Sequence, residues 1–325
     1  MKLPRRRFLQ LSGVAAALCA ASRTAGAQSY PARPVSIVVG FAPGGPTDLA
    51  ARLIGQWLSE RLGQPFIVEN RPGAATNIAT EAVAHAAPDG YALLAAVSSN
   101  TINPTLYPKL TFNFIRDLAM VGGVHSSPLI LEVNPSVPVN SVPELIAYAK
   151  ANPGRISLAS FGAGTISHVA GELFKLKAGI QMLHVPYRGS APMVIDLLSG
   201  QVNAAIDNVP SSLEHIKAGK LRALAVTTTA RSPALPQVPT LADFQPGFEA
   251  SAWIGIAAPR KTPAEIIHKL NKEINAGLAD PKIAARIAEW GATALAGSPA
   301  DLDRLVADRT EQWAKVIRAA KIQLD

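Results

Sequence analysis

Two glycine-rich segments carry the residue types that could hold an anion. One runs Phe41-Ala42-Pro43-Gly44-Gly45-Pro46-Thr47-Asp48, and the other runs Ser160-Phe161-Gly162-Ala163-Gly164-Thr165-Ile166-Ser167-His168. Glycine lets the backbone turn tightly and approach a ligand closely. Each segment leads into a stretch with helical periodicity, and the free N–H groups and positive dipole end of a helix N-terminus attract an anion. Both segments therefore predict non-covalent binding of a carboxylate or a phosphate.

The candidate ligand contacts in these segments are backbone donors and polar side chains: Pro43, Gly44, Gly45, Thr47, Asp48, Phe161, Gly162, Ala163, Gly164, Thr165 and His168. Thr47 or Asp48 could instead cap the helix that follows, and the first segment could be a tight turn with nothing bound. The second segment fails as a dinucleotide fingerprint, because Ser167 stands where the third glycine is needed. His168 could donate to a ligand or be hydrogen-bonded within the protein.

Polar residues after three further predicted strands complete the candidate site. Tyr187 and Arg188 suit a carboxylate, because a guanidinium offers a charged fork and a phenol a hydroxyl. An ordinary surface charge is the alternative for Arg188. Asp207 could accept from a ligand, cap a helix or form an ion pair between domains. Ser98 and Asn100 belong to a polar segment, residues 98–101, which we interpret as a loop that lines a cleft.

The sequence lacks the motifs of common enzymes. It has no Gly-x-Ser-x-Gly elbow, no Walker loop and no His-Glu-x-x-His. Its six histidines show no metal-ligand spacing, and no two acidic residues stand out as a general acid and base. Cys19 is the one cysteine. We expect no catalytic residue, no metal and no cofactor.

Alternating strands and helices must position these segments. Each candidate segment follows a β-branched run and precedes an amphipathic stretch, a rhythm that predicts an α/β fold with a parallel sheet covered on both faces. Ligand loops then lie at the carboxyl ends of the strands. Helix starts are predicted at Ser141, Thr262 and Ser298 from their caps. The predicted strands are 35–39, 66–68, 91–95, 129–133, 156–160, 182–185, 204–207, 222–227 and 253–257, and the main helices are 49–62, 77–87, 165–177, 190–199 and 211–217.

The chain is long enough for two domains. We expect it to cross between them near residues 124–129 and again near 248–258. Domain 1 would then be discontinuous, with residues 28–126 and 250–325, and domain 2 would comprise residues 127–249. A chain of this length suits two domains of ordinary size.

Residues 1–27 have the pattern of a cleaved signal peptide. Basic residues precede an apolar run at 8–21, and small residues suit cleavage between Ala27 and Gln28. Arg5-Arg6-Arg7-Phe8-Leu9 favours the twin-arginine route, while Pro4 departs from that pattern and leaves the Sec route open. The apolar run is shorter than the ~20 residues of a membrane span. Leu18 before Cys19 argues against a lipid anchor. We expect a periplasmic protein.

The net charge of +8 falls largely on this segment. Residues 1–27 hold five basic residues and no acidic one, which leaves 26 Lys and Arg against 23 Asp and Glu. A small excess spread along the chain gives no footprint for nucleic acid.

Nine short stretches, in order along the chain, resemble the Bug, or tripartite tricarboxylate transporter receptor, family of periplasmic solute-binding proteins. They include Phe41–Asp48, Glu69-Asn70-Arg71-Pro72-Gly73-Ala74, Asn103-Pro104-Thr105-Leu106-Tyr107, Phe161–Thr165 and Val185-Pro186-Tyr187-Arg188-Gly189. The resemblance implies a periplasmic-binding-protein type II (Venus flytrap) fold, with two Rossmann-like domains and a two-strand hinge. It also implies that the loops Pro43–Asp48 and Gly162–His168 hold ligand carboxylates, partly through water. Residues 98–101 and Asp207 fall where the family varies with its ligand.

The predicted function is capture of a small organic acid, favouring a dicarboxylate, and its delivery to membrane permease subunits by a monomeric receptor. Ligand that bridges two domains binds the closed state better and shifts the population toward it. An alternative keeps the fold and makes the protein a periplasmic sensor partner for an aromatic acid or an uncharged polar solute. A third is an α/β enzyme of unknown reaction, which the missing motifs disfavour.

Overall fold

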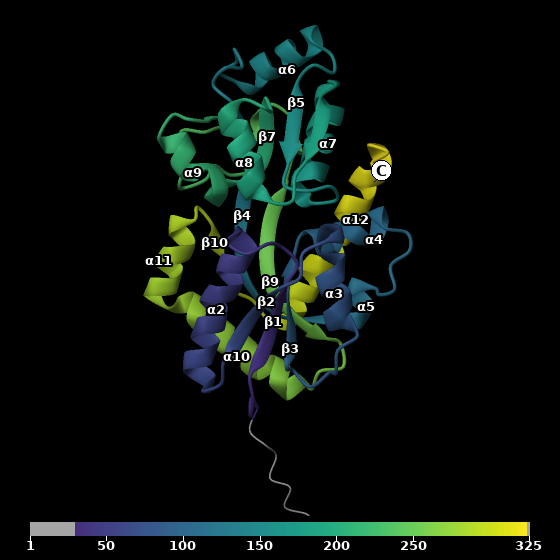
Figure 1. The fold of residues 1–325 in the computed structure, drawn as a ribbon, viewed down its shortest axis with the longest axis vertical. Coiled ribbons are helices and arrows are strands. Elements are labelled where there is room, and N and C mark those ends of the chain that lie inside the picture. The colour runs from purple at the N-terminus through teal and green to yellow at the C-terminus, as the bar shows by residue number, and fades with distance from the viewer. Residues whose placement is uncertain (1–29, 324–325) are drawn as a thin grey trace, which may run out of the picture.

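A computed structural model describes residues 30–323. Figure 1 shows two lobes, one above the other, joined by long strands. The strands are β1 (Val35–Val39), β2 (Phe66–Asn70), β3 (Ala92–Val97), β4 (Leu118–Val133), β5 (Ser157–Ser160), β6 (Leu183–Pro186), β7 (Ala204–Asn208), β8 (Arg222–Val226), β9 (Ser251–Pro259) and β10 (Thr293–Ala294). The helices are α2 (Pro46–Leu62), η1 (Ala74–Thr76), α3 (Asn77–Ala84), α4 (Ser99–Leu106), α5 (Phe114–Asp117), α6 (Val142–Ala151), α7 (Ile166–Ala178), α8 (Ser190–Ser199), α9 (Val209–Lys217), η2 (Leu241–Asp243), α10 (Ala264–Ala279), α11 (Pro281–Glu289) and α12 (Pro299–Ala319).

The strands form one continuous hydrogen-bonded path in the order β2-β1-β3-β9-β4-β7-β5-β6, and β8 and β10 also pair with β4. The predicted parallel pairing is confirmed for β1 with β2 and β3, and for β5 with β6 and β7. It is wrong for β4 and β9, which run antiparallel to each other and to the strands beside them. These two strands carry the chain between the lobes, so they do not follow the strand–helix–strand rule.

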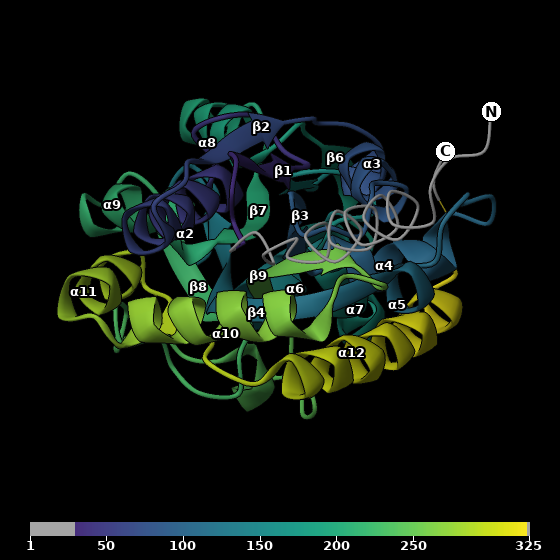
Figure 2. The same ribbon diagram turned by 90° about the horizontal axis from the view of Figure 1, so that it is seen from below.

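Alternating side chains of the lower sheet give that lobe a core on each face. Val35, Ile37 and Val39 pack with α2 and α10, while Val38 faces α3 and α12. In Figure 2 α2 and α11 lie to the left of the strands, and α3 and α5 to the right. Successive strand residues point to opposite faces, so a sheet covered on both sides needs apolar residues at every position. The fold is α/β, as predicted.

Thr227 ties together the two segments that cross between the lobes. The first 11 residues of β4, up to Pro128, pair with β9, and from Leu129 onward β4 pairs with β7 and β8. The fully buried Thr227 hydroxyl accepts from the Leu129 N–H at 3.0 Å and donates to the Ala250 carbonyl at 2.6 Å. One side chain therefore joins the residue at which β4 enters the upper lobe to the residue just before β9 leaves it.

The C-terminal helix α12 makes a third connection, which the sequence did not predict. Its first half buries Leu302 and Val306 in the lower lobe. Its second half buries Trp313 and Ile317 in the apolar cluster that forms the core of the upper lobe and also includes Ile102 and Leu106 of α4. Figure 1 shows this yellow helix rising from one lobe to the other.

Three predicted helix starts can be compared with the structure. Ser141 and Ser298 accept from the backbone N–H three residues on, as predicted for α6 and α12. The predicted start at Thr262 is wrong, because α10 begins at Ala264 and its N-cap is Pro263. The Thr262 hydroxyl is buried without a partner among the described residues. Among residues 30–323, no helix combines the length and the apolar content that a bilayer crossing needs.

Candidate ligand-binding cleft

A cavity of about 100 Å³ lies between the lobes. Its floor contains Val97, Ile254 and His125, which stand in one row across β3, β9 and β4. Phe41 and Phe161 add apolar walls from opposite lobes. Because a buried water needs roughly 10–15 Å³ on this measure, the cavity suits a ligand of roughly seven to ten non-hydrogen atoms.

Four helices begin at this cavity, two from each lobe. Their N-cap residues, Gly45 of α2, Ser98 of α4, Gly189 of α8 and Asn208 of α9, all line it. None of these four caps its helix through a side chain within the described residues. Away from the cavity, α5, α6, α11 and α12 have a side-chain cap, whereas α10 does not. No capping side chain therefore covers these four N-termini, and the first-turn N–H groups that remain can donate to the oxygens of a ligand; Pro46, Pro192 and Pro210 have no N–H, and the Thr101 N–H donates to the Ser98 carbonyl.

Arg188 is the cation best placed to meet an anion here. It lines the cavity and also a second hollow beside it, between the turn at 73–76 and the loop at 161–163. It makes no ion pair or hydrogen bond with another residue in the range 30–323. Its neighbour Tyr187 borders the second hollow, but the Tyr187 hydroxyl donates to Asp196 at 2.7 Å. Burial and that carboxylate raise the pKa of Tyr187 to about 12.

Asp48 holds the first glycine loop in place. The helix begins at Pro46, not at residue 49 as predicted, so the proposals that Thr47 or Asp48 is its N-cap are wrong. The Asp48 carboxylate accepts from the Gly44 N–H at 3.0 Å, from Arg52 at 2.9 Å and from Asn70 at 2.9 Å. Burial alone would raise the pKa of Asp48, but these hydrogen bonds outweigh it and keep the pKa below its ordinary value. Pro43, Gly45 and Thr47 line the cavity above it.

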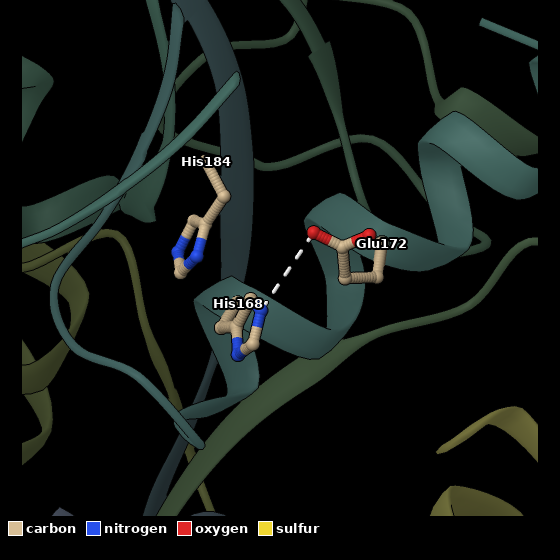
Figure 3. A group of neighbouring side chains, drawn as sticks. All are labelled: His168, Glu172 and His184. Carbon is tan, nitrogen blue, oxygen red and sulfur yellow. Dashed lines mark ion pairs between the residues drawn. The ribbon is translucent and has the colours of Figure 1, made fainter. Parts of the chain in front are cut away.

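His168 supports the second glycine loop from beneath. Its Nδ1 accepts from the Gly164 N–H at 3.2 Å, and its ring stacks on His184 with 3.9 Å between centroids (Figure 3). Burial, aided by His184 and Lys175, lowers the pKa of His168 to about 3. The neutral ring can therefore accept from the loop. Gly162, Ala163 and Thr165 of this loop line the second hollow.

His168, Glu172 and His184 lie close enough together to be considered as a cation site (Figure 3). Two features oppose that role. The imidazole planes are 7° from parallel, so their in-plane lone pairs do not converge on one point. The Lys175 ammonium lies 2.6 Å from a Glu172 oxygen and repels a second cation. The contacts fit support of the loop.

Gly164 lies at the contact between the lobes. A side chain there would meet Ala75 at 3.4 Å and Tyr107 at 3.5 Å, both in the lower lobe. Its φ of +75° belongs to the left-handed region. Ala74, Ala75 and Thr76 opposite are also left-handed, with φ between +47° and +78°. Such strain in residues other than glycine is characteristic of ligand sites and switch regions.

Asp207 lies under the helix N-termini of the upper lobe. It is fully buried, accepts from the Ser190 hydroxyl at 2.6 Å and from the Asn208 N–H at 2.7 Å, and is bridged by Ser212 to buried Glu132. Burial raises the pKa of Asp207 to about 6, and burial followed by the charge of Asp207 raises that of Glu132. Asp207 is not among the residues that line the cavity, although Ser190 and Asn208 are.

The segment 98–101 is not the loop that was predicted, because Ser99 begins α4. The Ser98 hydroxyl accepts from the Trp253 N–H at 2.9 Å, and Ser98 lines the cavity. Asn100 is turned inward, accepting from the Val97 N–H at 2.8 Å and donating to Thr80 at 2.8 Å.

The predicted site residues thus fall into two groups: those that line a hollow and those that lie behind the lining. Those at the surface of the two hollows are Pro43, Gly45, Thr47, Ser98, Phe161, Gly162, Ala163, Thr165, Tyr187 and Arg188, and Gly44 borders a smaller hollow nearby. Those behind it are Asp48, Asn100, Gly164, His168 and Asp207. Sequence reasoning missed His125, Ser127 and Trp253 of the floor and Ser190 and Asn208 of the upper wall. Ser190 starts the predicted helix 190–199, and Asn208 directly follows the predicted strand 204–207, so the rule that found Arg188 could have found them.

Two lobes around a cavity lined by uncapped helix N-termini define a solute-binding protein. The chain belongs to the tripartite tricarboxylate transporter receptor family, because the model described as "Tripartite tricarboxylate transporter family receptor" matches residues 50–322. Proteins of this family are periplasmic binding receptors, so the chain is not an enzyme.

Individual relatives match along almost the whole chain. Protein BugT of Bordetella pertussis (strain Tohama I) is 40% identical over 321 residues, which is 98% of each chain. The structure of R. palustris Rpa4515 with adipate has a TM-score of 0.87 and 39% identity, over 90% of this chain and 99% of that one. MatC from Rhodopseudomonas palustris, with bound malate, has a TM-score of 0.84 and 32% identity, over 89% and 100% of the two chains.

Proposed function

We propose that this protein captures a small organic acid, favouring a dicarboxylate, between its lobes and delivers it to the membrane permease of a tripartite transporter. One observation carries the proposal: within residues 30–323, four helix N-termini without a side-chain cap and an Arg188 without a partner converge on one cavity. A carboxylate accepts from backbone N–H groups and pairs with a guanidinium. The cavity volume and the acids held by two relatives support the same ligand class.

The arrangement also supports binding by closure. Gly45 and Ser98 belong to the lower lobe, while Gly189, Asn208 and Arg188 belong to the upper one. An acid held by both sets binds the closed state more tightly than the open state and shifts the population toward it. The predicted domain boundaries, with 28–126 and 250–325 in one domain and 127–249 in the other, are part of this proposal.

Isothermal titration calorimetry on residues 28–325 tests the ligand class. Malate, succinate, adipate and benzoate are titrated beside glucose and ATP, and we expect saturable binding to at least one acid. Arg188→Met should lower that affinity at least tenfold, because a charge-assisted fork is lost. Arg155→Met, at an exposed loop arginine with no side-chain partner among the described residues, is the matched control and should leave it unchanged. Binding of glucose or ATP with none of the acids would contradict the proposal.

Delivery is tested separately, in cells of the source organism that lack this gene. We expect them to lose uptake of the radiolabelled acid. Normal uptake together with a lost transcriptional response would favour the sensor alternative. The predicted signal peptide, residues 1–27, lies outside the described residues. N-terminal sequencing of the periplasmic protein should begin at Gln28.

A further inference from the structure

His125 is a buried polar side chain of the cavity floor that lacks a partner. It is 2% exposed and lines the main cavity, and neither ring nitrogen has a hydrogen bond within residues 30–323. A histidine ring always carries at least one N–H donor, and its neutral form also carries one acceptor. Leaving such a group unsatisfied costs about 1–3 kcal/mol, so the position calls for a partner that the described residues do not supply.

The surroundings of His125 leave the main cavity and a smaller hollow beside it as the places for that partner. Its neighbours in the floor row, Ile254 and Val97, are apolar. Trp290 packs edge-on against the ring at 5.9 Å. The ring also borders a smaller hollow between the N-terminal ends of α2 and α9. A ligand seated at the helix N-termini reaches the floor within the same cavity.

The charge state of His125 suits a selective hydrogen bond. The nearest cationic groups named by the contacts are Arg188, at the cavity wall, and Arg286, whose guanidinium lies 5.9 Å from the Trp290 ring centre. Among the described residues, no Asp or Glu lines this cavity. Burial lowers the pKa of His125 to about 4, so the ring is neutral at neutral pH. A neutral ring offers one hydrogen-bond donor and one acceptor but carries no positive charge, so it does not bind anions by charge alone.

We propose that His125 hydrogen-bonds a second polar group of the bound acid, distinct from the carboxylate held at the helix N-termini, and so selects acids that are polar at both ends. The inference rests on the proposed function and assigns the selecting residue. A site that hydrogen-bonds a substrate group discriminates strongly against an analogue that lacks this group.

Three pairs of acids test the assignment, each matching a dicarboxylate with the monocarboxylate of the same chain length: succinate with butyrate, glutarate with pentanoate, and adipate with hexanoate. In the wild type we expect at least a tenfold preference for the dicarboxylate in the best-bound pair. His125→Phe should reduce this preference to less than threefold, mainly by weakening the dicarboxylate. His125→Gln, which keeps a donor, should retain part of it. His268→Phe, at an exposed position of α10, is the control and should keep all of it.

A preference that survives in His125→Phe overturns the inference and leaves the proposed function standing. Wild-type protein that binds no acid of any pair overturns the inference, and the proposed function is refuted as well if malate and benzoate also fail to bind. If His125→Phe does not fold, His125→Leu takes its place in the same comparison. A second measurement uses the wild-type protein itself and does not depend on whether His125→Phe or His125→Leu folds. In ¹⁵N-histidine-labelled wild type, the His125 ring resonances, assigned by their absence in His125→Gln, should move on addition of the best dicarboxylate, and unmoved resonances overturn the inference.

Discussion

At the residue scale, Gly45 shows how an N-cap without a side chain can serve a ligand. Glycine leaves the first turn of α2 uncovered, and the nearest atom to an added Cβ would be the Ala42 carbonyl oxygen at 3.8 Å. A methyl group therefore fits the fold and reduces the space in front of the helix N-terminus.

Gly45→Ala should lower the affinity for the best-bound acid at least tenfold while changing the free energy of unfolding by less than about 1 kcal/mol. Gly297→Ala is the matched control, since a Cβ there also meets nothing closer than 3.8 Å and lies away from the cavity. Calorimetry gives the affinity and urea denaturation the stability. Unchanged affinity in Gly45→Ala would remove the N-terminus of α2 from the site.

Sequence alone predicted two glycine loops that do border hollows, but it did not predict which of their side chains face a hollow. Glycine, proline and hydroxyl residues between a strand and a helix predict a ligand loop, and both glycine segments do border a hollow. Whether Asp48 or His168 faces the ligand or the loop depends on partners elsewhere in the chain, such as Asn70 and His184. His125 carried no local signal, because only the pairing of β4 with β9 places it on the floor.

At the element scale, two antiparallel strands, β4 and β9, cross between the lobes, and the Thr227 hydroxyl bonds the segments at their upper ends. Local patterning predicted residues 129–133, where β4 is apolar and buried, but missed residues 118–128. That part contains Gly122 and Gly123, and the register shifts twice between Met120 and His125. An irregular strand next to a hinge has no regular period for sequence analysis to detect.

Thr227→Val should lower the free energy of unfolding by about 2 kcal/mol, because the nearly isosteric side chain leaves the Leu129 N–H and the Ala250 carbonyl without their partner. Urea denaturation measures the change. Thr228→Val is the neighbouring control, since its hydroxyl bonds at the surface, and Thr227→Ser should recover most of the loss. Equal stability of Thr227→Val and wild type would show that the hydroxyl does not tie the hinge.

At the scale of the whole molecule, buried titratable groups make stability depend on pH in opposite directions. The pKa values of His125 and His168, about 4 and about 3, lie below that of an unfolded histidine, so both favour the folded state more as the pH rises toward ~6.5. The raised pKa values of Glu132 and Asp207 favour the folded state at low pH. Their contribution is complete below ~4 and is lost as the pH rises.

Glu132→Gln isolates one of these contributions. As the pH rises above ~4.3, wild type loses stability because Glu132 ionises more readily in the unfolded state than when buried. Glutamine does not ionise, so the free energy of unfolding of the variant should rise relative to that of wild type. The difference in unfolding free energy should grow by up to about 1.4 kcal/mol per pH unit. Urea denaturation at a series of pH values from 4.5 to about 7.5 measures it. Parallel profiles for the two proteins would mean that Glu132 has an ordinary pKa in the folded state.

The position of α12 sets a time at which folding can finish. Trp313 and Ile317 complete the core of the upper lobe, and Leu302 and Val306 that of the lower one. A nascent chain that has reached residue 298 therefore lacks part of both cores. At about 5–20 residues per second, the ribosome needs about 1–5 s to add residues 299–322. Neither lobe can reach its final packing before residues 299–322 have been added.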